Sequence, residues 1–183
     1  MPPEKKNTIA RRNFIRDTSL AAAGFFIVPR HVLGRGFTAP SDKLNIAGIG
    51  VGGKAEVNLP YAWNKGAENI VALCDVDDRM AVKARKQWPN APYYRDYREM
   101  LKKKKKNIDA VIITTPDHMH AVQALAAMQM GKHVYVEKPL THDIYEARIL
   151  TQAAHKYKVV TQMGNQGSSG DDTRKVETWI QDG

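Results

Sequence analysis

Three glycines, Gly48, Gly50 and Gly53, form a G-x-G-x-x-G pattern whose spacing suits a dinucleotide. A short apolar run precedes them, and the residues that follow can open a helix. In this arrangement Gly48 would permit a tight turn, Gly50 would let a pyrophosphate approach the backbone, and Gly53 would let helix and strand pack together. The pyrophosphate would bind the unpaired amides at the positive end of the helix dipole. The expected phosphate-binding residues are Gly48, Gly50, Val51, Gly52 and Gly53.

An acidic residue ends the next apolar run. Asp75 lies 22 residues after Gly53, which is the distance at which dinucleotide-binding folds place the carboxylate that binds the adenosine ribose. A carboxylate there repels the 2′-phosphate of NADP, so we expect NAD, although Arg79 and Lys83 follow closely enough to soften that preference. A glycine-rich turn of some other α/β protein is the alternative, because a lone G-x-G-x-x-G is a weak signal.

Apolar runs and helical stretches alternate after Ser41, which predicts an α/β fold built on a doubly wound parallel sheet, with strand order 3-2-1-4-5-6. The predicted strands are 43–49, 69–74, 92–94, 109–114, 132–136 and 159–163. The predicted helices lie near 53–65, 78–88, 96–106, 118–130, 142–157 and 171–182. We expect Pro60 to kink or end the first helix.

The composition, with 43% hydrophobic and 26% charged residues, is that of an ordinary globular protein. Five positive charges of the net +9 come from the run Lys102–Lys106, which suits either a polyanion-binding patch or a solvated helix end. We favour the helix end and expect no nucleic-acid partner, because no aromatic residue interrupts the run. The single cysteine, Cys74, excludes an intrachain disulfide and is expected in the core rather than as a nucleophile.

The first forty residues have the layout of an export signal. Arg11 and Arg12 precede Phe14-Ile15-Arg16 and an apolar stretch at 20–28 that is too short to span a membrane. We predict that residues 1–40 are a twin-arginine-type signal and linker, cleaved near 38–40 or kept as an anchor. The folded, cofactor-loaded protein would then reach the periplasm, with membrane contact only through this signal. An amphipathic N-terminal extension is the alternative.

Two further polar groups follow the predicted fourth and fifth strands. The segment Thr114–His120 comes after the fourth, and Glu137-Lys138-Pro139 comes after the fifth. The carboxyl ends of parallel strands meet at one edge of a sheet, where doubly wound folds bind ligands. We therefore expect both groups beside the cofactor.

Taken together, these motifs resemble the Gfo/Idh/MocA oxidoreductases, named for glucose–fructose oxidoreductase, inositol dehydrogenase and rhizopine catabolism. The matching segments are 48–53, Asp75, Thr115–Ala121 and Gly131–Pro139, and 162–167 looks like exported bacterial members. The resemblance covers nearly all of residues 43–183. It implies an NAD(P)-dependent enzyme that transfers hydride between the cofactor and a small-molecule carbohydrate (a sugar, polyol or glycoside), as a homo-oligomer when full length.

The resemblance also implies roles for single residues. Lys138 would lie beside the nicotinamide, bind substrate and relay protons, since an ammonium near a developing alkoxide lowers the cost of its charge. Glu137 would contact the nicotinamide ribose. The remaining expected lining residues are Thr115, Pro116 and His120 along the cofactor and Asn165 at its nicotinamide end. No metal site is expected, because His118 and His120 lack the i, i+4 spacing.

Members of the family carry a second, mostly antiparallel domain that supplies the substrate pocket. We expect residues 41–165 to be the dinucleotide-binding domain and 166–183 to begin the connection to that second domain, so the chain reads as an N-terminal fragment or truncated product. Two other functions stay open: NAD-dependent, redox-assisted glycoside cleavage and a non-catalytic nucleotide-binding module. Lys138 counts against one glycosidase branch, which replaces this lysine.

Overall fold

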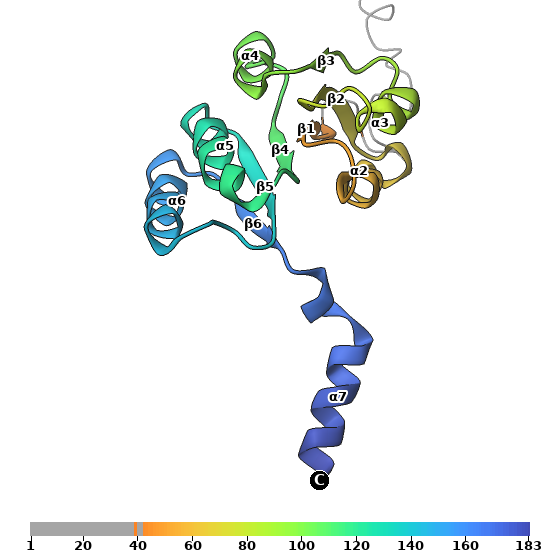
Figure 1. Cartoon of the computed structure of the whole chain (residues 1–183), viewed down its shortest axis with the longest axis vertical. Helices are drawn as coiled ribbons and strands as arrows, with labels where there is room; N and C mark the ends of the chain where they lie inside the picture. The colour runs from red at the N-terminus through yellow and green to blue at the C-terminus, as the bar shows by residue number, and fades with distance from the viewer. Residues whose placement is uncertain (1–38, 40–41) are drawn as a thin grey trace, which may run out of the picture. The chain divides into compact units, whose positions relative to one another are not determined.

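The computed structural model describes Ala39 and residues 42–183 (Figure 1). The predicted export signal, residues 1–40, lies outside the described residues apart from Ala39. The chain divides into two compact units, Met1–Asp42 and Lys43–Gly183, and the fold described below is that of the second unit. Within the described residues, no helix combines the length and the apolar character needed to cross a bilayer.

The second unit contains a six-stranded parallel sheet in the order β3-β2-β1-β4-β5-β6, which confirms the predicted topology. The strands are β1 Asn45–Ile49, β2 Asn69–Cys74, β3 Tyr93–Tyr94, β4 Ala110–Ile113, β5 His133–Glu137 and β6 Thr161–Gly164. The chain starts at the centre of the sheet, builds one half through β3, and returns to add β4 on the other side of β1. This reversal creates a crevice at the carboxyl ends of β1 and β4, the position at which such sheets bind ligands.

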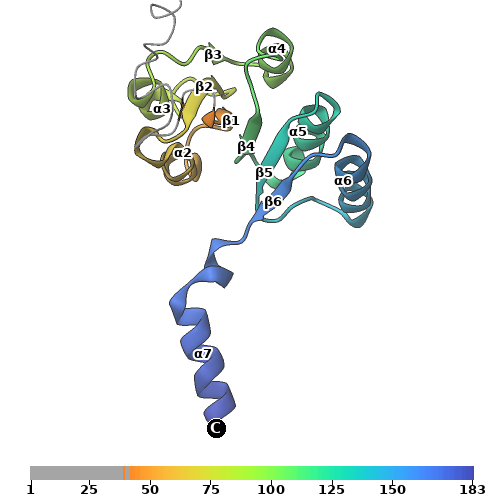
Figure 2. The same cartoon turned by 180° about the vertical axis from the view of Figure 1, so that it is seen from behind.

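Helices cover the two faces unequally (Figures 1 and 2). The helices are α2 Ala55–Trp63, α3 Val82–Gln87, α4 Tyr97–Lys103, α5 Asp117–Gln129, α6 Ile144–Tyr157 and α7 Asp171–Asp182, with 3₁₀ turns η2 Asn64–Gly66 and η3 Gln166–Ser169. One apolar cluster lies between the sheet and α4, α5 and α6, and includes Leu101, Val111 and Met128. A smaller cluster on the other face joins α2 and α3 to the sheet through Leu59, Leu73 and Ala84.

Pro60 was expected either to kink or to end the first helix. It does not end α2, which continues to Trp63. Its end is set instead by Asn64, which adopts left-handed backbone angles (φ 47°, ψ 55°). Leu59 is fully buried against Gly48 and fixes the helix on the sheet. This packing outweighs the backbone N–H that Pro60 lacks.

Two other expectations are confirmed. Lys102 and Lys103 form the last turn of α4 and Lys104 caps it, so the lysine run is an exposed helix end. Cys74 is only 2% exposed at the end of β2, and burial raises the pKa of its thiol to about 12. A thiol held neutral in this way is a poor nucleophile, and Cys74 acts as a small core residue.

Candidate functional site

The glycine-rich turn follows β1 and lies beside the carboxyl ends of β2 and β4. The Gly50 N–H donates to the Cys74 carbonyl (2.8 Å), and the Thr114 N–H donates to the Ile49 carbonyl (2.9 Å). Gly50 has a left-handed backbone (φ +75°), and a Cβ built there would lie 2.8 Å from Thr115 Cγ2 and 2.9 Å from the Thr115 nitrogen. Gly50 therefore meets two demands, a backbone conformation that other residues avoid and a contact with Thr115 that leaves no room for a side chain.

The outer two glycines act differently from the expectation. Gly48 lies within β1, and a Cβ there would lie 3.0 Å from Val51 Cγ1 and 3.1 Å from Leu59 Cδ1, so Gly48 provides the close packing of strand and helix. Gly53 has φ +54° with no atom within 4 Å of its ideal Cβ position. The packing role predicted for Gly53 is therefore wrong, because Gly53 is needed for its backbone conformation.

Asp75 closes the turn from the side of β2. Its Oδ2 accepts from the N–H groups of Val51 (2.8 Å) and Gly52 (3.3 Å), and its Oδ1 accepts from the N–H of Asp77 (3.0 Å). The acid thus lies against the amides that the sequence assigned to a pyrophosphate. A phosphate that takes up the same amides must displace this carboxylate, which is then free to accept hydroxyl donors.

Two adjoining hollows open at the carboxyl edge of the sheet. The first, here the Asp75 hollow, encloses about 420 Å³, and its walls include Gly50, Gly52, Gly53, Asp75, Thr115 and Pro116. The second, here the Lys138 hollow, encloses about 710 Å³, and its walls include Thr115, Glu137, Lys138 and Asn165. Lys54, Thr114 and Thr115 line both. The structure therefore brings nine of the predicted site residues around a depression whose two hollows share three wall residues.

His120 lies beneath this depression and lines neither hollow. Its side chain is 1% exposed, with Nδ1 2.7 Å from the Pro139 carbonyl oxygen and Nε2 2.7 Å from the Thr115 carbonyl oxygen. The imidazole therefore braces the loop after β4 against the loop after β5. A direct contact between His120 and a cofactor stays a prediction.

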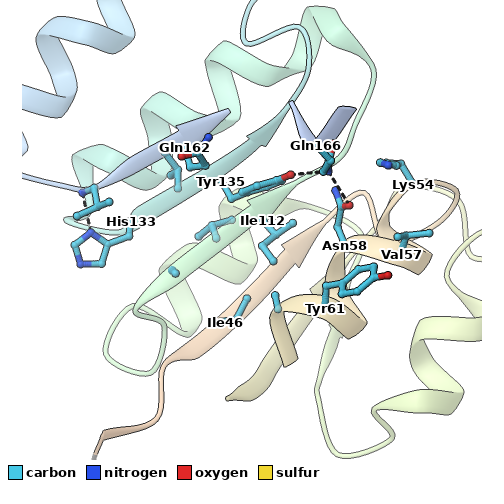
Figure 3. Close-up of a pocket in the computed structure, with 15 residues that line it drawn as sticks. Ile46, Lys54, Val57, Asn58, Tyr61, Ile112, His133, Tyr135, Gln162 and Gln166 are labelled. Carbon is cyan, nitrogen blue, oxygen red and sulfur yellow. Dashed lines mark hydrogen bonds between the residues drawn. The ribbon is translucent and has the colours of Figure 1, made fainter. Parts of the chain in front are cut away.

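Glu137 is buried at the end of β5, with 7% exposure, and amide groups hold it. Its Oε2 accepts from Asn58 Nδ2 and Gln166 Nε2, each at 3.4 Å. Gln166 Nε2 also donates to Tyr135 Oη (2.7 Å) and Asn58 Oδ1 (3.3 Å), as Figure 3 shows. Burial, together with the nearby Glu137 charge, raises the pKa of Tyr135. These contacts fix the carboxylate next to Lys138, whose side chain is exposed in the Lys138 hollow.

Replacing Gly164 by alanine is expected to disturb this arrangement. A Cβ at Gly164 would overlap Glu137 Oε2 and lie 2.6 Å from Tyr135 Oη. We expect the free energy of unfolding to fall by about 1–3 kcal/mol, as in other overpacked sites. Urea denaturation of the chain measures this. Gly167→Ala is the matched control, because nothing lies within 4 Å of its ideal Cβ and its stability should not change. Equal stabilities of the two variants would contradict the packing at Gly164.

Two basic residues at the site were not predicted from the sequence. Lys54 lines both hollows directly after the last glycine, a position that was a usable signal because a cation there faces the phosphate-binding turn. Arg95 lines the Asp75 hollow and donates through Nη2 to the Val76 carbonyl (3.0 Å). In contrast, Arg79 and Lys83 line neither hollow and form surface ion pairs with acidic partners (2.8 and 2.7 Å). Arg95, rather than Arg79 or Lys83, is thus the basic residue after Asp75 that lines this hollow.

The described residues contain no group of three or more His, Cys, Asp or Glu side chains that could hold a metal ion.

Comparison of the sequence with known protein families identifies the family of this chain. The Gfo/Idh/MocA family, described as an oxidoreductase family with an NAD-binding Rossmann fold, matches residues 44–165. The chain belongs to this family. The match spans the sheet from β1 to β6, all walls of the Asp75 hollow and most walls of the Lys138 hollow, so the resemblance inferred from the motifs is confirmed together with the Rossmann fold.

Individual relatives of the chain have different activities in their names. A glycosyl hydrolase family 109 protein of a Shewanella species is 27% identical over 175 residues, which cover 82% of this chain and 38% of the relative. A 4-carboxy-2-hydroxymuconate-6-semialdehyde dehydrogenase of a Sphingobium species is 30% identical over 122 residues, covering 67% and 38%. The solved structure of myo-inositol 2-dehydrogenase from Lactobacillus plantarum superposes with a TM-score of 0.67 at 26% identity, covering 77% and 42%. The chain thus spans about two fifths of these relatives.

Proposed function

We propose that this chain forms the NAD-binding part of an oxidoreductase that transfers hydride between the cofactor and a sugar, polyol or glycoside. One observation carries the proposal: the glycine turn, Asp75 and Lys138 border two hollows that share the walls Thr114 and Thr115. A dinucleotide has two halves joined by a pyrophosphate, and this depression has two compartments joined beside a phosphate-binding turn. The adenosine half fits beside Asp75 and the nicotinamide half beside Lys138.

The residues present fit such a cofactor. A pyrophosphate that displaces the Asp75 carboxylate gains the backbone N–H groups of Val51 and Gly52, and Lys54 adds a positive charge beside them. When bound, the nicotinamide ring accepts or supplies the hydride. Lys138 hydrogen-bonds the substrate oxygen that becomes a ketone or alkoxide, stabilises its charge and relays its proton. Glu137, held by Asn58 and Gln166, accepts hydrogen bonds from the ribose hydroxyl groups at the nicotinamide end of the cofactor.

The charge of Asp75 leads us to propose NAD rather than NADP. Calorimetric titration of the 183-residue chain should show that NADH binds roughly tenfold or more tighter than NADPH. A carboxylate beside the 2′-phosphate costs at least about 1.4 kcal/mol of binding free energy, which corresponds to a tenfold loss of affinity. Asp75→Ala is expected to reduce the preference to within about threefold, helped by Arg95 in the same hollow. Asp77→Ala, a neighbouring surface acid paired with Arg79, is the control and should keep the preference. Equal binding of both cofactors by the unaltered chain would contradict the role of Asp75, and no binding by the folded chain would contradict the proposed function.

Redox-assisted glycoside cleavage is the second candidate, favoured by the similarity to glycosyl hydrolase family 109 proteins. The two candidates differ in their products. Simple dehydrogenation by the full-length protein leaves an oxidised carbohydrate and one reduced cofactor per turnover. Cleavage leaves a hydrolysed glycoside and no net change in the cofactor, so product analysis with absorbance at the NADH band separates them.

We also propose export by the twin-arginine route. The support is the pair Arg11-Arg12 before a short apolar stretch, together with a cofactor that is more readily loaded inside the cell before transport of a folded protein. In fractionated cells the protein should appear in the periplasm, and replacement of both arginines by lysine should retain it in the cytoplasm. Finding the unaltered protein wholly in the cytoplasm would contradict export.

A further inference from the structure

A third hollow lies on the sheet face beside α2 and shares the wall residues Lys54 and Gln166 with the Lys138 hollow. This hollow, here the α2 groove, encloses about 470 Å³, and its walls include Ile46, Val57, Tyr61, Ile112 and Tyr135 (Figure 3). Several of its apolar side chains are open to solvent: Val57 is 46% exposed, Tyr61 80% and Val160 69%. Clustered apolar exposure of this kind marks a surface that another element covers.

The groove arises because the helices cover the two faces of the sheet unequally. On the side of α4, α5 and α6 the apolar cluster extends from β2 to β5. On the opposite side α2 and α3 pack against β1 and β2. Among the described residues, no helix on that side covers β5 and β6. Parallel sheets of this class are normally covered on both faces. Within the part of the chain that the structure describes, this face therefore lacks a helix over β5 and β6.

Helix α7 exposes apolar side chains that have no packing partner among the described residues. None of its twelve residues is buried, although Val176, Trp179 and Ile180 form an apolar stripe at i, i+3 and i+4. These three side chains are 47%, 68% and 76% exposed, respectively. The helix lies beyond the end of β6 (Figures 1 and 2). An amphipathic helix is stabilised mainly by burying such a stripe, so α7 also lacks its packing partner.

We propose that α7 docks into the α2 groove of its own chain and completes the helical layer on that face. The connection starts at the groove, because Gln166 lines it and is hydrogen-bonded there to Asn58 and Tyr135. Only residues 167–170 separate Gln166 from α7, and they include two glycines. A helix of twelve residues is about 18 Å long, close to the roughly 16 Å of the five-residue strand β1. Helix α7 can therefore run back along the strands, parallel to α2.

Charge favours α7 as the occupant of the groove, and tether length favours the α7 of the same chain over that of a second copy. The groove carries the positive charge of Lys54 and no acidic residue among those described, whereas α7 begins with Asp171 and Asp172. A four-residue connection gives α7 an effective concentration in the millimolar range. A second copy at micromolar concentration competes poorly with it. The docking test below needs no nucleotide, so its outcome is separate from that of the cofactor titration.

Disulfide cross-linking of the 183-residue chain tests the docking. Two double variants, Val57→Cys/Val176→Cys and Tyr61→Cys/Ile180→Cys, place cysteines on α2 and on the stripe at similar depths. Under mild oxidation at low micromolar concentration we expect at least one pair to form an intrachain disulfide, at least tenfold faster than the control. The control is Tyr145→Cys/Ile180→Cys, because Tyr145 is exposed on α6, on the opposite side of the sheet. The native Cys74 is buried and gives little background.

Cross-links that form only between chains would overturn the proposal in favour of a second copy, and rates equal to the control would overturn it outright. Hydrogen exchange on the unaltered chain provides a second measurement that needs no cysteine variant. Docking predicts that the amides of residues 175–182 exchange at least tenfold more slowly than in Val176→Asp/Ile180→Asp, in which the stripe carries charge. Equal exchange in both proteins would also overturn it.

Discussion

Replacing Lys138 by alanine is expected to lower kcat of the full-length protein by about 10²–10⁴-fold, the usual contribution of a positioned proton donor or acceptor. The ammonium is exposed in the Lys138 hollow, next to a carboxylate that Asn58 and Gln166 hold in place. Nothing in the fold depends on it, because the side chain is exposed and takes no part in the two apolar clusters. The loss should therefore appear in turnover, while the affinity for NADH changes by less than about threefold.

Steady-state kinetics and calorimetry on the same preparations separate these effects. Lys102→Ala, an exposed lysine at the end of α4, is the control and should keep full activity. Lys138→Arg keeps the charge without an equivalent proton donor, so it should recover substrate binding more than turnover. Unchanged activity of Lys138→Ala would remove this residue from the mechanism.

The second large effect is expected for Gly50→Ala. The left-handed backbone costs an alanine roughly 1–2 kcal/mol, and overpacking against Thr115 adds about 1–3 kcal/mol. The free energy of unfolding should thus fall by about 2–5 kcal/mol relative to the unaltered chain. The turn can relieve the clash only by moving away from Thr115, which opens the shared wall of the two hollows. We therefore also expect NADH binding to weaken by at least roughly tenfold.

Gly53→Ala separates the two causes, because Gly53 has a positive φ but no neighbour within 4 Å of its ideal Cβ. This variant should lose only the backbone part, about 1–2 kcal/mol. Urea denaturation gives the stabilities and calorimetry gives the affinities. If the two variants lose the same stability, the contact with Thr115 is not what requires glycine at position 50.

Local patterns were enough to predict the architecture. The continuously apolar β4, the glycines after β1 and the alternation of strands and helices each depend on residues close in sequence, and together they determine the strand order. The same holds for Asp75 and for the segments after β4 and β5. Parallel strands carry whatever follows them to one edge of the sheet, so the topology alone places Lys138 and Thr115 near the glycine turn.

Contacts between residues distant in sequence decided the rest. Gly48 proved to be the packing glycine because Leu59 folds back onto it, and Gly53 proved to need only its backbone conformation. His120 lies beneath the site because two carbonyl groups from separate loops reach its ring.

Arg95 enters the Asp75 hollow although no pattern around it indicated a site. The open groove beside α2 exists only because helices cover the two faces of the sheet unequally. The spacing of apolar residues in the sequence indicates which residues face inward, but it does not indicate which distant residue each of them contacts. For that reason the sequence predicted the edge of the sheet at which the chemistry lies, while only the tertiary structure assigned each side chain its partner.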